Sequence, residues 1–367
     1  MDRGTSETGT RMVNVAALTY GLHTPSVRFR LRQHLSMLAE GGFRVDEYPF
    51  RIDHLKDVRG RLLSVEGPFA SASRYLWGAV RSSHYLPWIS SSLRADITWL
   101  FKDTALGRVP FRVPLKRPLV FDFDDAVWEL NPGNWEALLR ILKSADLVIA
   151  GNDYLAERII PHTSRVEIVP TAVDTARFKP ADNKSDDKRF VIGWTGSRPS
   201  LHYLEGLEPV LAPFLKQHSD AILSVIADEP PRFKDIPADR WQFERWSPKS
   251  EVQSIQRMDV GLMPLVDTEL ARGKCSFKMI QYMACGVPVV VSPVGMNRDV
   301  LALGSSGFSA ESPEQWRDAM ESIMRDRNAA YQMGQEGRRV VEQHYSADRI
   351  GNRLVELLRE VASGVRP

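Results

Sequence analysis

Cysteines are scarce in this sequence, and long apolar runs are absent. Its 367 residues include only Cys275 and Cys285, and neither has the C-x-x-C or histidine neighbours of a metal or redox site. No stretch approaches the roughly 18 uninterrupted apolar residues of a membrane span. Residues 1–11 lack the apolar centre of a signal peptide. We therefore expect a cytoplasmic protein with a disordered tail at residues 1–11.

The sequence also lacks an excess of charge of one sign. Its net charge is +2, which requires no polyanionic partner, and its 43% hydrophobic and 26% charged residues are those of an ordinary globular protein. A chain of 367 residues is longer than one hydrophobic core usually supports. Two domains are therefore expected.

Two common nucleotide-binding motifs are missing. No G-x-G-x-x-G follows the first expected strand, and no G-x-x-x-x-G-K-[ST] occurs anywhere in the chain. These absences remove the main support for a dinucleotide oxidoreductase or a P-loop enzyme.

Strand-like apolar runs alternate with helical patterns through most of the chain, which predicts α/β units with parallel sheets. The first series of expected strands comprises residues 13–18, 96–101, 119–123 and 147–150, and the second comprises 190–194, 221–227, 260–264 and 289–292. The polar residues 181–189 have the composition of a linker, and a last helix is expected at about 347–361. The pattern predicts two Rossmann-like domains with a ligand site in the cleft between them.

Residues 273–288 form the most informative segment. Ser276 is a plausible N-cap for a short helix, and Gly286 suits the position just beyond its end. Lys278 then lies in the first helical turn, where a cation opposes the helix dipole. With Lys274 just upstream, this arrangement is favourable if an anion such as phosphate occupies the helix N-terminus.

Several segments together resemble the family 4 retaining glycosyltransferases of GT-B fold: residues 169–174 with 178–180, 281–288, 333–338 and 345–346. The resemblance implies an acceptor domain, a nucleotide-sugar domain and a final helix that crosses back to the first domain. After the expected tail at 1–11, we expect an N-terminal domain at 12–178, a C-terminal domain at 179–345 and a returning helix at 346–367.

The chain departs from this family at its Glu-x7-Glu motif, where Gly273 and Gln281 stand in place of the two glutamates. The Gln281 amide can still hydrogen-bond a ribose hydroxyl. The family's diphosphate-binding arginine and lysine align with Ser197 and His202. We interpret the chain as a divergent branch in which Lys274, Lys278 and Arg198 carry the positive charge.

Other candidates for the nucleotide-sugar site are assigned on local grounds. Gly196 and Ser197 form a small-residue turn that lets backbone amides approach a phosphate, although a simple surface turn fits as well. Trp246 is a candidate neighbour of the base, and a core tryptophan is the alternative. Ser276 and Phe277 begin the helix at the expected phosphate.

Acceptor contacts are expected from loops of the first domain. His23 follows the first strand and can position a hydroxyl, or it is an exposed loop histidine. Arg28 and Arg30 are expected at the start of a helix, where they favour a phosphate or form a solvated face. Asp124, in the run 122–125, is expected to line the cleft or cap the next helix rather than to bind a metal.

Residues 50–118 combine twelve basic with five acidic residues and carry Tyr75, Trp77, Tyr85 and Trp88. This composition fits either peripheral contact with an anionic membrane near a lipid-linked acceptor, or a solvated helical face. No nucleic-acid reader motif accompanies the charge, so nucleic acid is not an expected partner.

The resemblance implies a retaining hexosyltransferase that needs no metal or cofactor. Its donor would be a nucleoside-diphosphate sugar, and its acceptor a glycan, a lipid-linked molecule or a small molecule. Two alternatives stay open: a nucleotide-sugar epimerase of the same plan, and a sugar-nucleotide-binding protein without activity.

Overall fold

The structure is a computed structural model that describes residues 11–21, 25–50, 72–73, 83, 85–102, 107, 114–130, 133–182 and 189–364. Residues 1–10 of the predicted tail and 183–188 of the predicted linker lie outside this set. The chain divides into two compact units. The first contains residues 1–151, 155–169 and 351–367, and the second contains residues 152–154 and 170–350.

The first unit is built on a six-stranded parallel sheet with the order β2-β1-β3-β4-β5-β6. Its strands are β1 (Val13–Thr19), β2 (Phe43–Pro49), β3 (Ile97–Phe101), β4 (Leu119–Phe123), β5 (Leu147–Ala150) and β6 (Val166–Ile168). The four predicted strands are confirmed. The edge strands β2 and β6 were not predicted, because β2 is largely polar and β6 has only three residues.

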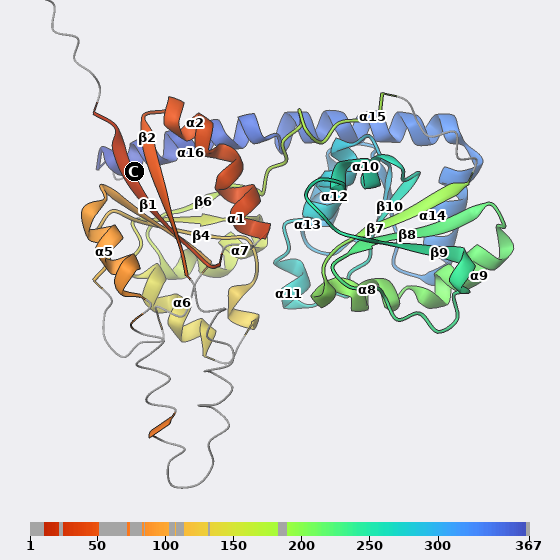
Figure 1. Cartoon of the computed structure of the whole chain (residues 1–367), viewed down its shortest axis with the longest axis horizontal. Helices are drawn as coiled ribbons and strands as arrows, with labels where there is room; N and C mark the ends of the chain where they lie inside the picture. Colours follow the sequence, from red (N-terminus) through yellow and green to blue (C-terminus); the bar gives the residue numbers. More distant parts are fainter. Residues whose placement is uncertain are drawn as a thin grey trace, which may run out of the picture. The chain divides into compact units, whose positions relative to one another are not determined.

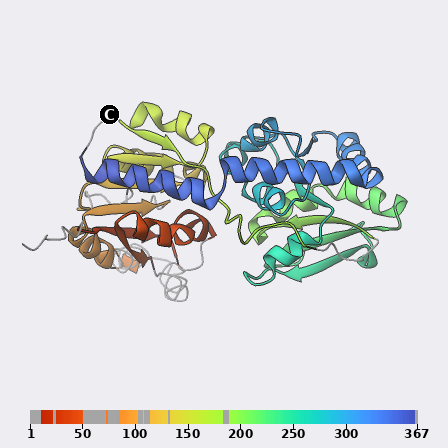
Figure 2. The same ribbon diagram turned by 90° about the horizontal axis from the view of Figure 1, so that it is seen from above.

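Helices cover both faces of this sheet (Figure 1). They are α1 (Pro25–Arg30), α2 (Leu35–Glu40), α5 (Leu86–Arg94), α6 (Asn134–Leu142), α7 (Asp153–Ile159) and α16 (Ala347–Ala362). Most of α16 lies against one face of the sheet (Figure 2), where Val355 meets Gly41 and Arg353 pairs with Glu167 at 2.9 Å.

The second unit has another six-stranded parallel sheet, with the order β12-β11-β10-β7-β8-β9. Its strands are β7 (Phe190–Thr195), β8 (Ala221–Ala227), β9 (Trp241–Arg245), β10 (Val260–Met263), β11 (Val289–Val291) and β12 (Gly307–Ser309). The second series of predicted strands is confirmed. All strands are parallel, but the chain adds β8 and β9 on one side of β7 and then β10, β11 and β12 on its other side. This change of side between β7 and β10 is that of a Rossmann fold.

The helices of the second unit also lie on both faces of its sheet, with α8 and α9 on one and α12 and α15 on the other (Figure 1). They are α8 (Leu201–Glu205), α9 (Glu208–Gln217), α10 (Glu251–Gln256), α11 (Glu269–Arg272), α12 (Phe277–Ala284), α13 (Met296–Ala302), α14 (Pro313–Arg325) and α15 (Arg327–His344). Helix α14 buries Trp316, Met320 and Ile323 in the hydrophobic core of the unit.

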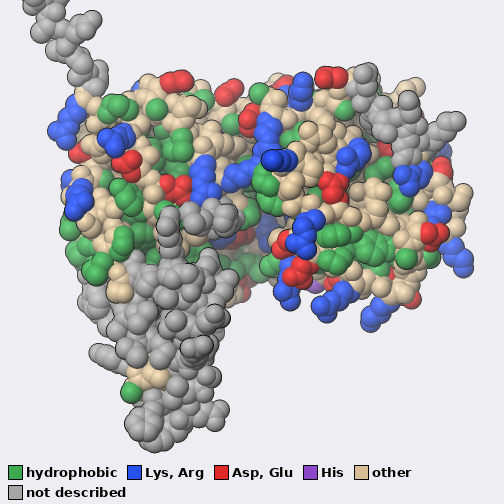
Figure 3. Space-filling model, in the orientation of Figure 1, with side chains coloured by type: hydrophobic (Ala, Val, Ile, Leu, Met, Phe, Trp, Pro, Cys, Tyr) green, Lys and Arg blue, Asp and Glu red, His purple; other side chains and the backbone are tan. Residues whose placement is uncertain are grey.

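In the part of the chain that the structure describes, no helix has the length and apolar character needed to cross a bilayer. The view in Figure 3 shows basic and acidic side chains together on the described surface of each unit. This mixture agrees with the small net charge of +2.

Candidate functional site: the N-terminus of helix α12

In a fold of this kind, the ligand is expected at the carboxyl ends of the two strands where the strand order switches, which here are β7 and β10. Gly196 directly follows β7, and Pro264 directly follows β10. The chain after β10 passes through α11 and enters α12, which packs on β10 and β11. The sequence therefore brings the loop after β7 and the start of α12 to the same edge.

Helix α12 has the predicted boundaries. It begins at Phe277, and Gly286 adopts a left-handed conformation with φ of 69° just beyond its end, where glycine avoids a steric penalty. Ile280 and Ala284 are buried against the sheet. Lys278 and Gln281 are three residues apart and thus share one helix face.

Lys278 lies beside the loop after β7. Its Nζ is 4.5 Å from the ring centre of Trp194, within cation–π range. A Cβ placed on Gly196 would lie 2.2 Å from the Trp194 ring and 2.9 Å from Lys278 Nζ. Gly196 is thus required for space, because any side chain there would displace the tryptophan and the lysine.

No carboxylate of a described residue balances the charge of Lys278. Among the described residues, neither Lys278 nor Lys274 pairs with a carboxylate. Burial of the half-buried side chain lowers the pKa of Lys278 to about 7, and the nearby charge of Lys274 lowers it further. A bound anion would relieve both effects.

Ser276 occupies the predicted N-cap position but does not cap the helix. Its backbone is left-handed, with φ of 49° and ψ of 24°, and its side chain makes no hydrogen bond to the first turn. The buried hydroxyl instead donates to Asn297 Oδ1 at 2.7 Å. The predicted capping bond is therefore wrong, because the left-handed backbone and the hydrogen bond to Asn297 hold the hydroxyl away from the first turn.

The loop that carries Lys274 is anchored by a side chain that the sequence did not single out. Asn152 belongs to the second unit, and its Nδ2 donates to the carbonyl oxygens of Gly273 at 3.2 Å and Lys274 at 3.1 Å. Asn152 and Asn297 are both buried polar residues. Neither belongs to a local motif, so no sequence signal identified them.

Gln281 is 7% exposed, and its amide makes no hydrogen bond to a described residue. A buried amide normally has a partner, since an unpaired one costs free energy. The geometry is compatible with the predicted ribose contact.

The other predicted donor residues lie on the surface. The Arg198 guanidinium pairs with Glu229 at 3.2 Å, and its backbone N–H donates to Asp228 at 2.6 Å. Ser197 and His202 are exposed, and the His202 ring packs on Tyr203. The structure thus brings Gly196 and Lys278 together, while Arg198 would have to leave Glu229 to reach a phosphate.

Trp246 follows β9 and is 37% exposed, so the alternative of a core tryptophan is wrong. Its indole Nε1 donates to Glu251 at 3.1 Å, and Arg177 pairs with the same carboxylate at 2.7 Å. These contacts orient one edge of the ring and leave part of its surface to solvent.

The first helix of the first unit differs from the prediction. Arg28 and Arg30 lie in the last turn of α1 rather than at its start, so the helix dipole favours them there and requires no anion. Arg28 lies over the Phe29 ring at 4.5 Å. Arg30 is buried and pairs with Asp122 at 2.6 Å, so its charge is already compensated.

Asp124 pairs with Lys102 at 3.2 Å, and Lys102 also contacts Asp125. The predicted capping role is not observed, because the next helical turn, Val127–Glu129, has no side-chain cap. Burial opposes ionisation of Asp124, but the charges of Lys102 and Arg30 hold its pKa below the ordinary value. In the described ranges no cluster of three or more histidine, cysteine, aspartate or glutamate side chains is arranged for a metal.

His23 lies outside the described residues, as do Tyr75, Trp77 and most of the basic residues between 50 and 118. Tyr85 and Trp88 are buried and pack with Phe50. These two aromatic residues therefore belong to the core of the first unit rather than to an exposed aromatic surface.

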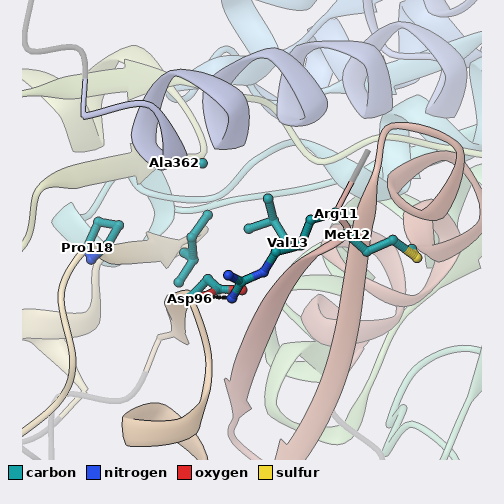
Figure 4. Close-up of a pocket in the computed structure, with 7 residues that line it drawn as sticks. Arg11, Met12, Val13, Asp96, Pro118 and Ala362 are labelled. Carbon is teal, nitrogen blue, oxygen red and sulfur yellow. Dashed lines mark hydrogen bonds and ion pairs between the residues drawn. The ribbon is translucent and has the colours of Figure 1, made fainter. Parts of the chain in front are cut away.

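A separate cavity of about 240 Å³ lies at the opposite, amino-terminal edge of the first sheet (Figure 4). It is lined by Arg11, Met12, Val13, Asp96, Ile97, Pro118 and Ala362. Arg11 and Asp96 pair with each other at 3.3 Å, so their charges compensate each other. Its position differs from the carboxyl edge where ligands of such folds bind.

Comparisons with known proteins agree with this architecture. Residues 190–326 match the family model described as Glycosyl transferases group 1. No curated protein matches the chain. Sucrose-phosphate synthase from Thermosynechococcus elongatus superposes with a TM-score of 0.70 at 13% identity, covering 96% of this chain and 100% of that one.

Two further solved structures show the same fold. Anabaena HepE in complex with UDP and glucose has a TM-score of 0.68 at 13% identity, covering 95% of this chain and 100% of that one. A glycosyltransferase from Rickettsia africae has a TM-score of 0.69 at 12% identity, covering 96% and 100%. The chain thus has the GT-B fold, and its segment 190–326 is similar to the glycosyl transferases group 1 family.

Proposed function

We propose that the protein is a retaining glycosyltransferase that moves a hexosyl unit from a nucleoside-diphosphate sugar to a glycan, lipid-linked or small-molecule acceptor without a metal. The observation that carries the proposal is the pair of lysines, Lys274 and Lys278, beside the uncapped N-terminus of α12 at the expected ligand edge. The structure of HepE with UDP-glucose supports a donor of this class.

The chemistry requires stabilisation of the leaving group. As the bond between the anomeric carbon and the phosphate oxygen breaks, negative charge grows on the diphosphate. The Lys278 and Lys274 ammonium groups, together with the backbone N–H groups of Lys278 and Met279, would stabilise it. The acceptor oxygen bonds to the anomeric carbon on the same face, and its proton passes to the leaving phosphate.

The remaining groups have supporting roles in this proposal. Gln281 binds a ribose hydroxyl, since its amide has no partner among the described residues. Trp246 offers a partly exposed ring to the base. Asp124, held ionised by Lys102, receives an acceptor hydroxyl.

We also propose that the protein acts in the cytoplasm and contacts the membrane peripherally, based on the basic composition of residues 50–118. Retention by anionic liposomes at low salt tests this proposal. If such liposomes do not retain the protein, the membrane contact is excluded.

The experiment that tests the function is a thermal-shift panel of UDP-, GDP-, ADP-, TDP- and CMP-sugars, followed by an assay of the selected donor. Stabilisation by one nucleoside-diphosphate sugar, with transfer of its sugar only when an acceptor is added, supports the proposal. Conversion of the donor without an acceptor would favour an epimerase, and binding without hydrolysis or transfer would favour a non-catalytic protein. Stabilisation by none of the donors would contradict the proposal.

A further inference from the structure

The backbone of Ser276 is in a conformation that residues with a Cβ rarely adopt. Its φ is 49°, and in the described ranges the only other non-glycine residue with positive φ is Lys102. Ser276 is 1% exposed. A buried residue stays in such a conformation only when its surroundings hold it there, and such residues concentrate at functional sites.

A chain of hydrogen bonds supplies this constraint. Asn297 Nδ2 donates to the Ser292 carbonyl at 3.0 Å, which directs Asn297 Oδ1 towards the Ser276 hydroxyl at 2.7 Å. The Ser292 hydroxyl in turn accepts from the Leu265 N–H at 2.9 Å, in the loop after β10. Asn297 is fully buried, so water does not compete for these hydrogen bonds.

This network decides whether α12 is capped. A serine before a helix usually turns its hydroxyl to the N–H groups of the first turn. Here the hydrogen bond to Asn297 holds the hydroxyl away from the first turn, so the N–H groups of Lys278 and Met279 keep their hydrogen-bonding capacity for an anion. A free Ser276 hydroxyl would compete with a phosphate for the same donors.

We propose that Asn297 is a positioning residue of the diphosphate site: by holding the Ser276 hydroxyl and its left-handed backbone, it keeps the N-terminus of α12 open to a pyrophosphate group. This inference rests on the proposed function, and it explains how a serine at an N-cap position is compatible with anion binding. Asn297 itself touches no substrate in this account.

The test measures binding of UDP and of inorganic pyrophosphate to the full-length protein by calorimetry. Asn297→Ala releases Ser276, and we expect about tenfold weaker binding of both probes, the scale of one lost hydrogen-bonding group. Adding Ser276→Gly to Asn297→Ala should recover at least half of the lost binding free energy. Glycine adopts the left-handed conformation without strain and has no hydroxyl to cap the helix.

The matched control is Asn134→Ala in the first unit, where a buried amide likewise donates to a carbonyl, that of Val127. It should lower the melting temperature without changing the affinity for either probe. If Asn297→Ala does not fold, Ser276→Ala and Ser276→Gly give the same test: both lack the hydroxyl, and only glycine favours the left-handed backbone. The glycine variant should bind pyrophosphate at least threefold more tightly than the alanine variant.

The possible failures are distinct. Wild-type affinity in Asn297→Ala, no recovery in the double variant, or equal affinity of the two Ser276 variants would overturn the role of Asn297 and leave the diphosphate site intact. Failure of the wild-type protein to bind either probe would overturn the proposed function, and this inference with it.

Discussion

The Lys278 ammonium lies 4.5 Å from the ring centre of Trp194, and Gly196 leaves the space that both side chains occupy. The aromatic face attracts the ammonium, but it does not neutralise its charge. Lys274 is nearby, and no described carboxylate pairs with Lys278. A bound anion would therefore stabilise this half-buried cation.

The space at Gly196 gives a first prediction. Gly196→Ala places a methyl group 2.2 Å from the Trp194 ring, so the ring and Lys278 must move. We expect a lower melting temperature and at least tenfold weaker donor binding, measured by calorimetry. Gly206→Ala is the control, because its Cβ would meet only two carbonyl oxygens, at 3.2 and 3.6 Å. Unchanged donor binding by Gly196→Ala would show that the space beside Gly196 is not part of the donor site.

A second prediction concerns turnover. Lys278→Ala should lower the rate of sugar transfer about 10²-fold, the scale of losing one preorganised electrostatic group. Steady-state kinetics with the selected donor measures this effect. Lys216→Ala removes an exposed lysine of α9 and should transfer sugar at the wild-type rate. If Lys278→Ala also keeps that rate, Lys278 does not act on the leaving group.

The lowered pKa of Lys278 predicts a pH dependence of stability. Its pKa is about 7 in the folded chain against an ordinary value of 10.5. The unfolded chain therefore binds more protons between these pH values, and the contribution of Lys278 to the free energy of unfolding rises as the pH increases through this window. Denaturant unfolding of wild type and Lys278→Met measures it. The free energy of unfolding of the wild type should rise relative to that of Lys278→Met as the pH increases from 7 towards 10, whereas a constant difference would show that this pKa is not lowered.

The same pKa predicts that donor binding takes up a proton. An anion favours the charged lysine and raises its pKa, so affinity should fall as the pH rises above about 7. Calorimetry in two buffers of different ionisation enthalpy detects the uptake. Lys278→Met should abolish it, and uptake that persists in this variant would assign it to another group.

For Gln281, the two probes separate the ribose contact from the phosphate contact. Gln281→Ala should weaken UDP binding about fivefold, the scale of one hydrogen bond, and leave inorganic pyrophosphate binding unchanged. Gln253→Ala, at an exposed position of α10, is the matched control. Equal loss for both probes would mean that Gln281 supports the helix rather than the ribose.

Arg30 and Asp122 supply a prediction on stability. Arg30→Met leaves the buried Asp122 carboxylate without its ion-pair partner and should destabilise the protein by about 3–5 kcal/mol in denaturant unfolding. Adding Asp122→Leu should recover much of this loss. Donor affinity should not change, since the Arg30 charge is already compensated. Weaker donor binding by the single variant would restore a ligand role for Arg30.

The sequence predicted the fold well where apolar runs were continuous. The central strands of both sheets and helix α12 are at their expected positions, because buried parallel strands give unbroken apolar segments. The edge strands β2, β6 and β12 were missed, since they are polar or very short. Helix α1 ends at Arg30, which reversed the expected effect of the dipole on its arginines.

The site was predictable only in part. The misplaced cation at Lys278 and the small residue Gly196 were visible as local patterns, and the structure places them side by side. Asn152 and Asn297 act through contacts that span 122 and 21 residues of sequence, so no local pattern contains them. Likewise, Ser276 has the ordinary appearance of an N-cap, and only its backbone conformation shows that it does not cap.

The central claim is that the N-terminus of α12, with Lys278, binds the diphosphate of a sugar donor. Calorimetric titration of wild type and Lys278→Ala with UDP, GDP, ADP and TDP tests it most directly. The account predicts that wild type binds one of these nucleotides selectively and that Lys278→Ala binds the same nucleotide at least tenfold more weakly. Equal affinity of the two proteins, or no binding of any nucleoside diphosphate by wild type, would contradict it.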